Sequence, residues 1–511
     1  MSVAAAYSVS HGQGPALDAS ADVLAITVFG DPNKDAIFKS IDVRLGGGLA
    51  DVAKTEQFEG KPGQQISIYA GKLLGAKRVL VLGAGPRGDY SDPHMRDTAA
   101  AVAQFANKVG AATVAFVMPT FGASRELHLV QLATEGLYLG TYKFARYLTG
   151  DDAKKPTSFK SLVVFADAKG SKRSAAQLRG FDTAVSRGAT IAKAVNHARD
   201  LINEPAAVVT PTALAADAQA IAKAHKGSLS VTVLDAKKCA ELGMGMFLAV
   251  GQGSDQEPKF IHITYKPAKK AKKKLCFIGK GVTFDSGGYS LKPSNAMEDM
   301  KIDMSGAAAV ISAMDAIATL GSEHEVHAVA ACCENLVSGR AYKLGDVLSS
   351  MDGTTVEINN TDAEGRLTLG DAITYARTKI QPDEMFDFAT LTGACMIALG
   401  PYTAGVMSDH EGLVKGWLAT AGRTGEDMWR LPLIGRLREQ LKSSIADMRN
   451  TGERYGGAIT AGLFLKTFAK DTPWVHVDLA GPASTSAPRP SQPKGGAGYA
   501  VATIVEYAAK N

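Results

Sequence analysis

Short apolar runs alternate with amphipathic stretches along the first third of the chain. The apolar runs that predict strands are 22–29, 78–83, 112–118 and 161–167. Apolar positions at helical spacing predict helices over 94–109 and 128–148. This order is typical of a parallel or mixed sheet covered by helices, so an α/β domain is expected here.

A long amphipathic stretch at 181–205 predicts a helix that ends near Pro205. Further strands are expected at 229–234, 259–265, 275–279, 325–332, 386–391 and 474–479, and further helices around 305–320, 366–378 and 458–469. The polar segment 149–160 indicates a loop or linker. We therefore expect three parts: an N-terminal α/β domain over 1–175, a connecting helix over 176–205, and a second α/β domain with a mixed, helix-covered central sheet over 206–511.

Length and composition agree with this division. A chain of 511 residues is too long for one ordinary core. No run of about eighteen uninterrupted apolar residues occurs, so no membrane span is expected. The N-terminal residues lack the basic and apolar regions of a leader. The five cysteines lie apart beside apolar residues, which predicts buried thiols in a reducing compartment; they are Cys239, Cys276, Cys332, Cys333 and Cys395. We expect a cytoplasmic protein.

The net charge of +5 is unevenly distributed, because six lysines fall in one window. They are Lys266, Lys269, Lys270, Lys272, Lys273 and Lys274. The window separates two predicted strands, so we interpret it as a solvated hairpin tip. A nucleic-acid-binding patch is the alternative, and it is disfavoured because no aromatic residues alternate with the lysines to stack on bases.

Two motifs resemble known binding sites, but neither lies next to the helix that such a site requires. Gly83, Gly85 and Gly88 have dinucleotide-binding spacing, but the chain continues as a loop and not as a helix, so a plain turn is favoured over a nicotinamide oxidoreductase site. His324 and His327 are three residues apart and lead into a predicted strand. A zinc-binding helix places its histidines four apart, so we interpret this pair as surface charge at a strand start.

Carboxylates and lysines gather where predicted strands meet glycine-rich turns. After the strand at 275–279, the glycines allow a sharp bend, so Lys280, Asp285 and Lys292 can converge on one cavity. Asp303 precedes a helical run, and taken alone it is best interpreted as a helix N-cap.

A third segment, 356–367, adds further charged groups. In an extended chain Asp362 and Glu364 point the same way, and Arg366 supplies a cation at the start of the next helix. A surface turn with solvated charges is the alternative, but an apolar helix follows directly. Four carboxylates in a partly buried cavity repel one another unless divalent cations neutralise them. Oxygen ligands suit Zn, Mn or Mg, and a lysine can join them only as the neutral amine.

The segments GKGVTFDSGG (279–288), KIDM (301–304) and NTDAEGRL (360–367), in this order, resemble the metal-binding and catalytic signatures of the leucyl (cytosol) aminopeptidase family. The resemblance covers most of residues 200–511. It implies a macro-like N-terminal α/β domain, a catalytic second domain, and two divalent ions per subunit, Zn or Mn with Mg or Co as alternatives.

The resemblance also implies a role for each site residue. Lys280, Asp285, Asp303 and Glu364 would bind one metal ion. Asp285, Asp362 and Glu364 would bind the other. Lys292 would stabilise the oxyanion, and Arg366 would hold a bicarbonate that acts as general base. The implied substrate pocket lies near Met300, Thr390 and Gly393.

We therefore expect a metal-dependent aminopeptidase that cleaves N-terminal residues, preferably Leu or other apolar ones, from peptides with a free N-terminus. The metal pair would lower the pKa of a bridging water, so that hydroxide attacks the carbonyl. The resemblance also implies a homohexamer. A DNA-binding role is the rival from another class, and salt-dependent retention on duplex DNA would support it.

Overall fold

The computed structural model describes residues 7–150 and 157–509, and the chain folds into two compact units. The first comprises Met1–Lys193 with Ala487–Pro493, and the second comprises Ala194–Ser486 with Lys494–Asn511. The division falls inside helix α6 (Ala175–Asn203). Residues 151–156 of the predicted linker lie outside the described residues. The domain limits 1–175, 176–205 and 206–511 stay a prediction.

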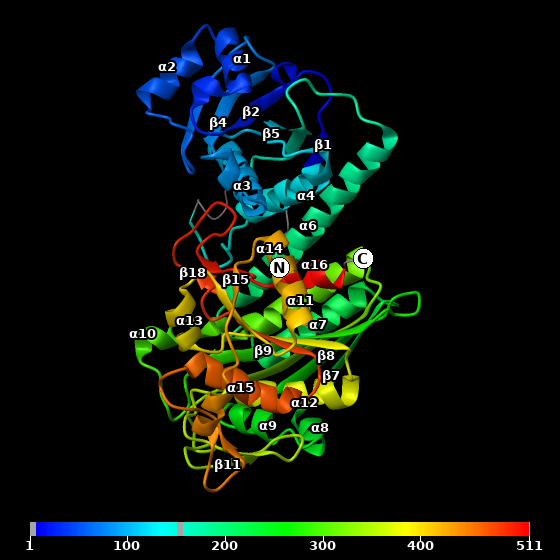
Figure 1. The fold of residues 1–511 in the computed structure, drawn as a ribbon, viewed down its shortest axis with the longest axis vertical. Helices are drawn as coiled ribbons and strands as arrows, with labels where there is room; N and C mark the ends of the chain where they lie inside the picture. Colours follow the sequence, from blue (N-terminus) through cyan, green and yellow to red (C-terminus); the bar gives the residue numbers. More distant parts are fainter. Residues whose placement is uncertain (1–6, 151–156, 510–511) are drawn as a thin grey trace. The chain divides into compact units, whose positions relative to one another are not determined.

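A six-stranded sheet forms the first unit, in the order β1-β6-β5-β2-β4-β3. Its strands are β1 (Ser8–His11), β2 (Ala21–Val28), β3 (Gln65–Tyr69), β4 (Ala76–Gly83), β5 (Thr113–Val117) and β6 (Ser161–Phe165). All neighbours are parallel except β3 and β4. Helices α1 (Ala36–Arg44) and α2 (Gly48–Thr55) cover one face, and α3 (Asp92–Lys108) and α4 (Ala123–Gly140) cover the other (Figure 1).

The helix predicted over 128–148 ends eight residues early, at Gly140. Thr141 follows as the C-cap, and its hydroxyl donates to the carbonyl of Leu137 at 2.9 Å. Such side-chain to backbone bonds compete with helix continuation, which the apolar pattern alone does not reveal.

The second unit contains an eight-stranded mixed sheet in the order β15-β14-β17-β13-β9-β10-β8-β7. Its strands are β7 (Leu229–Leu234), β8 (Lys259–Tyr265), β9 (Lys274–Asp285), β10 (Glu325–Asn335), β13 (Glu384–Ala389), β14 (Ala404–Met407), β15 (Met428–Arg430) and β17 (Trp474–Asp478). Short pairings add β11 (Val347–Ser349), β12 (Thr355–Glu357) and β16 (Met448–Arg449), and β18 (Ser484–Thr485) with β19 (Gly495–Gly496). The predicted α/β class and helix-covered mixed sheet are confirmed.

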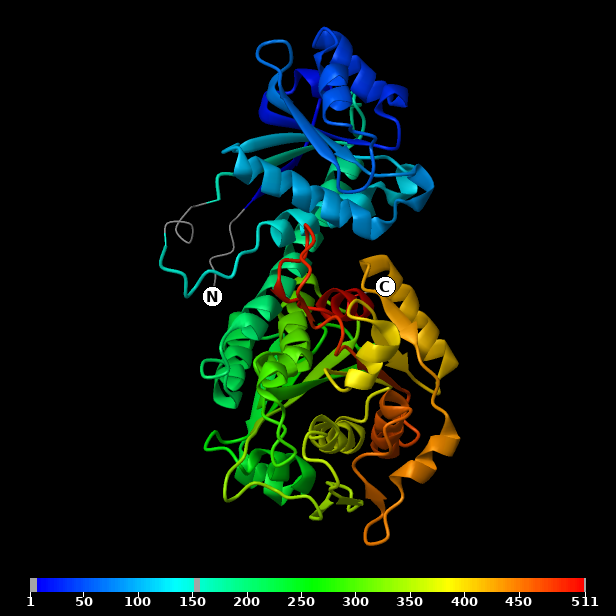
Figure 2. The ribbon, with the colours of Figure 1, turned by 90° about the vertical axis from the view of Figure 1, so that its left-hand side faces the viewer.

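Helices cover both faces of this sheet (Figure 1, Figure 2). One face carries α7 (Pro211–Ala224), α11 (Ser305–Leu320) and α16 (Val501–Ala508). The other carries α8 (Ala236–Glu241), α9 (Gly245–Gly251), α12 (Gly365–Tyr375) and α15 (Gly457–Ala469). The remaining helices are α10 (Ser294–Met297), α13 (Gly393–Leu399) and α14 (Glu411–Thr424).

Among the described residues, one helical stretch, Met300–Leu320, is long and apolar enough to cross a membrane, but 78% of its apolar window is buried inside the protein. It is a core helix, because its apolar side chains pack on the central sheet.

The interpretation of the lysine window from the sequence is wrong. The lysine window is not a hairpin tip, because β8 and β9 both pair with β10, which lies between them. The window is instead a connection across β10, where Lys272 and Lys273 pair with Glu323 and Glu384.

His324 and His327 are buried and are not surface charge. Burial lowers the pKa of both imidazoles. The prediction of buried thiols is confirmed, since all five cysteines are free and buried.

The central strands β9, β10 and β13 are parallel, so their carboxyl ends meet at one edge of the sheet. At this edge Asp285 ends β9 and lies opposite Asn335, which ends β10. The chemistry-bearing residues predicted from sequence gather here.

Candidate metal centre

The turn after β9 shapes the centre. Gly287 has φ 84°, and a Cβ at this position would lie 2.8 Å from Asp362 Oδ1 and 3.1 Å from the backbone nitrogen of Lys292. Glycine therefore permits both the left-handed turn and the close approach of the segment that carries Asp362. The turn returns the chain, so that Lys292 faces Asp285.

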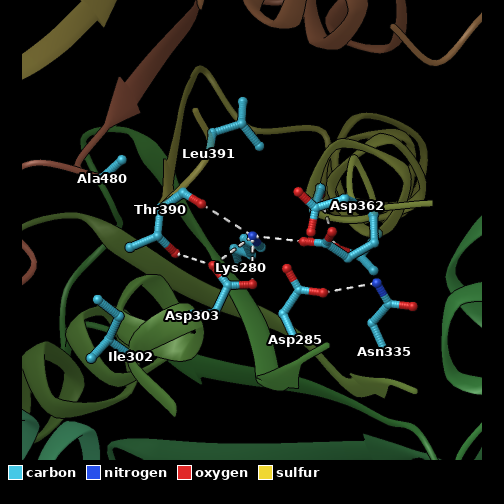
Figure 3. Close-up of polar contacts among 12 residues, drawn as sticks. Lys280, Asp285, Ile302, Asp303, Asn335, Asp362, Thr390, Leu391 and Ala480 are labelled. Carbon is cyan, nitrogen blue, oxygen red and sulfur yellow. Dashed lines mark hydrogen bonds and ion pairs between the residues drawn. The ribbon is translucent and has the colours of Figure 1, made fainter. Parts of the chain in front are cut away.

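Lys280 lies within β9 and joins two of the three carboxylate segments. Its amine donates to Asp303 Oδ1 at 2.7 Å and to the carbonyl of Thr390 at 3.1 Å, and it lies 2.9 Å from Glu364 Oε1 (Figure 3). Burial alone would lower the pKa of Lys280, but the Asp303 and Glu364 carboxylates raise it above its ordinary value. The amine is fixed among acids from distant parts of the chain.

Lys292 joins the other pair of acids. Its amine lies 2.8 Å from Asp285 Oδ2 and also pairs with Asp362. The segment 361–364 is not fully extended as expected, because Glu364 already has helical dihedral angles (φ −73°, ψ −35°) at the start of α12. As a result Glu364 contacts Lys280, whereas Asp362 contacts Lys292.

Asp303 is not a helix N-cap. It lies in a short 3-10 helix, Met300–Met304, and the N-cap of α11 is Met304. Asp303 Oδ1 instead accepts hydrogen bonds from Lys280 and from the hydroxyl of Thr390 at 2.7 Å. The carboxylate is directed into the centre.

Asp285, Asp303 and Glu364 each offer an oxygen within 4.8 Å of the others, and all three side chains are buried. Glu364 Oε2 is buried without a hydrogen-bond partner among the described residues. Burial raises the pKa of Asp303 well above its ordinary value, and it also raises the pKa values of Asp285 and Asp362. Crowded, buried acids with an unpartnered oxygen fit divalent cations, which these hard oxygen donors prefer.

Arg366 lies beside this cluster in the first turn of α12. Its Nη1 donates to the carbonyl of Asn450 at 2.8 Å, whereas its buried Nε has no hydrogen-bond partner among the described residues. Burial lowers the pKa of Arg366 to about 10, so the guanidinium stays charged at neutral pH. A buried cation with an unused donor is suited to hold an anion.

Two supporting residues were missed in the sequence. Asn335 donates from Nδ2 to Asp285 Oδ1 at 2.8 Å and to the carbonyl of Thr361 at 3.0 Å. Asp478 accepts from the backbone nitrogen of Leu391 at 3.2 Å and from the hydroxyl of Thr392 at 2.7 Å. Both residues end strands whose carboxyl ends meet at the site, and that position is the signal that could have found them.

A cavity of about 540 Å³ opens onto the cluster. The predicted pocket residues Met300, Thr390 and Gly393 all line it, as do Lys280, Asp285, Lys292, Asp303, Asp362, Glu364 and Arg366. Its other lining residues include Ile302, Leu391, Met396, Tyr402 and Ala480. The structure therefore brings every predicted site residue to one cavity, where charged groups adjoin an apolar wall.

Two family models match the chain. The catalytic-domain model of the cytosol aminopeptidase family matches residues 196–505, and the N-terminal-domain model of the same family matches residues 24–151. The chain belongs to the cytosol aminopeptidase family. Its cavity and charged cluster lie entirely within the part that matches the catalytic domain.

Proteins of similar sequence and structure match this chain over nearly its full length. A probable cytosol aminopeptidase of Nostoc punctiforme is 41% identical over 98% of this chain and 99% of its own, and one of Synechococcus sp. is 42% identical over 95% and 96%. A solved mutant of tomato leucine aminopeptidase superposes with a TM-score of 0.90 at 34% identity, covering 100% of this chain and 98% of its own. The bottromycin maturation enzyme BotP, solved in complex with Mn, gives a TM-score of 0.81 at 33% identity, covering 96% and 99%. The chain is an aminopeptidase and a hydrolase of peptides.

Proposed function

We propose that this aminopeptidase uses two divalent metal ions to remove N-terminal residues, preferably Leu or other apolar ones, from peptides. The observation that carries the proposal is the buried meeting of Asp285, Asp303 and Glu364, with an unpartnered oxygen on Glu364. Lys280, in the neutral amine form that an adjacent cation favours over the ammonium, would hold one ion together with Asp285, Asp303 and Glu364. Asp285, Asp362 and Glu364 would hold the other. When bound, the ions supply Lewis acidity and an activated water. Zn or Mn is favoured, the latter because the relative BotP was solved with Mn.

The residues of the chain supply the remaining chemistry. Lys292 lines the cavity as a cation and would stabilise the negative charge that develops on the substrate carbonyl oxygen. Arg366 would hold bicarbonate through its unused Nε, so that the anion accepts a proton during attack.

The apolar wall of the cavity would select the substrate side chain. Met300, Ile302 and Met396 line it, and methionine side chains adapt to varied apolar shapes. Burial of a Leu side chain against this wall would contribute about 2 kcal/mol. A polar N-terminal residue would lose that contribution.

We further propose a cytoplasmic homohexamer. The five free, buried cysteines suit a reducing compartment. Cytosol aminopeptidases are the named relatives over almost the whole chain. The mass of the particle in solution would test the hexamer directly.

The test is hydrolysis of Leu-p-nitroanilide before and after chelation, and again after re-addition of Zn²⁺ or Mn²⁺. Activity should vanish on chelation and return with metal, and N-acetyl-Leu-p-nitroanilide, the matched blocked substrate, should not be cleaved. Asp362→Ala should lose metal and activity. Lys292→Ala should keep its metal while turnover falls about 100-fold or more. Equal activity in both variants and the parent protein would refute the proposal.

A further inference from the structure

A second cluster of potential metal ligands lies on the neighbouring strands β8 and β10. In the antiparallel register His327 is paired with Thr264, and His262 is paired with Val329 two residues further along. Alternate residues of paired strands share one face, so the three polar side chains are neighbours. His327 and Asn335 are eight residues apart on β10, which places the cluster about 26 Å from the end that carries the peptidase centre.

The three side chains present their polar atoms to one point. His262 Nε2 lies 2.9 Å from His327 Nδ1, and Thr264 Oγ1 lies 3.3 Å from each of these nitrogens. A tetrahedral ion with ligands at about 2.0–2.1 Å separates its ligand atoms by roughly 3.3 Å. The triangle therefore has nearly the dimensions of one face of such a coordination sphere.

The other ring nitrogen of each histidine has a polar partner on the side away from the triangle. His327 Nε2 lies 2.9 Å from the carboxylate of Glu325, and His262 Nδ1 lies 3.2 Å from the hydroxyl of Tyr375. A histidine that binds metal usually donates its far N–H to a carboxylate, carbonyl or water, which fixes the tautomer. Here Glu325 fixes the Nδ1 lone pair of His327 toward His262.

Charge and burial also suit a cation. Burial lowers the pKa of His262 to about 4 and lowers that of His327, so both rings are neutral near pH 7. Neutral imidazole is the form that binds metal. His262 and Thr264 are partly exposed and His327 is buried, so the cluster lies beside the solvent-accessible surface.

We propose that His262, His327 and Thr264 bind one divalent transition-metal ion, with water completing its coordination. Imidazole nitrogens favour Zn²⁺, Ni²⁺ or Cu²⁺ over Mg²⁺ or Mn²⁺. The ion would join β8 to β10 at the edge of the sheet away from the peptidase centre. The alternative is a neutral hydrogen-bonded chain from Tyr375 through both imidazoles to Glu325, which needs no ion.

Copper distinguishes the two arrangements, because the proposed peptidase ligands include no histidine. One equivalent of Cu²⁺ is added to the metal-loaded enzyme, and pulsed electron paramagnetic resonance detects the remote nitrogen of each coordinated imidazole. The parent protein should show two imidazoles on the copper. His262→Gln and His327→Gln should each lose this two-imidazole signature while retaining peptidase activity, which reports that they are folded.

Two further variants sharpen the result. Glu325→Gln should weaken copper binding about 10–100-fold, because the substitution removes the carboxylate that accepts from His327 Nε2 and leaves the proposed ligands in place. His410→Gln, on a separate loop, is the matched control and should leave the spectrum unchanged. Absence of imidazole coordination in the parent protein, or its persistence in both histidine variants, would overturn the proposal and leave the neutral chain.

Discussion

At the scale of single residues, the centre depends on side chains that hold its charged groups in position. Asn335 orients Asp285 by donating to its Oδ1 at 2.8 Å. Asp285 and Glu364 stand out in sequence as acids beside glycine-rich turns. Asn335 does not, because its role depends on the parallel register that sets it beside Asp285. Asp303 shows the converse error: its position before a helix favours a cap, and only the contact with Lys280 reveals its direction.

Asn335→Leu tests the orienting role. The substitution removes the donor to Asp285 Oδ1 but adds no charge, so the carboxylate keeps only the backbone N–H of Gly287 on that oxygen. We expect metal affinity to fall about 10–100-fold while the fold is retained. Metal titration followed calorimetrically measures the change, with Asn33→Ala on an exposed turn as control. Unchanged affinity would show that Asn335 does not orient the ligand.

At the scale of elements, segments with a strong apolar periodicity were assigned the correct secondary structure. Elements with a weak pattern were missed. Strands β7 and β8 were predicted with their observed bounds, as was α11. The short strands β14 and β15 were missed, because three or four residues carry too little pattern. The lysine window was misplaced because neighbours in sequence, β8 and β9, are separated in the sheet by β10.

Close packing of α11 on the sheet supports the centre, and Gly306→Ala tests it. A Cβ at Gly306 would lie 2.0 Å from the carbonyl oxygen of Phe388 and 2.8 Å from the backbone nitrogen of Lys280. The helix would have to move away from β9, which should cost about 1–3 kcal/mol of stability and reduce activity. Chemical denaturation measures the loss. Gly412→Ala, where no atom lies within 4 Å, should be neutral or slightly stabilising; equal effects would contradict the packing argument.

An ion pair at the start of β2 makes the stability of the first unit depend on pH. Lys77 donates to Asp22 at 2.7 Å, and the backbone of Ala112 and Thr113 donates to the same carboxylate. The Lys77 contact lowers the pKa of Asp22 to about 2 from 3.8. A lowered carboxyl pKa stabilises the fold above about pH 4, and this contribution is lost as the pH falls toward about 2.

Asp22→Asn should therefore lower the free energy of unfolding by about 1 kcal/mol at neutral pH, after allowance for solvent screening. The difference from the parent protein should shrink steadily as the pH falls through that window. Urea unfolding at several pH values provides the comparison, and the exposed Asp89→Asn is the control. If the difference in free energy of unfolding grew as the pH fell, the ion pair would not be the source of the stability.

At the scale of the whole molecule, the sequence predicted two α/β parts and the site within the second. The order of the three charged segments along the chain sufficed for this prediction. Each segment follows a strand of the central sheet or precedes a helix that packs on it. The proposed homohexamer rests on the family resemblance, since no pattern within one chain records which surface would meet a copy. The edge where β9, β10 and β13 end is the feature that unites fold and chemistry.

The number of ions that this edge binds tests the account most directly. Mn²⁺ is titrated into the metal-free parent protein and into Glu364→Gln, and free Mn²⁺ is followed by electron paramagnetic resonance. Because Glu364 is proposed to contact both ions, the parent protein should take up two tightly bound ions per chain and the variant at most one. Two equally tight ions in Glu364→Gln, or none in the parent protein, would contradict the proposed centre.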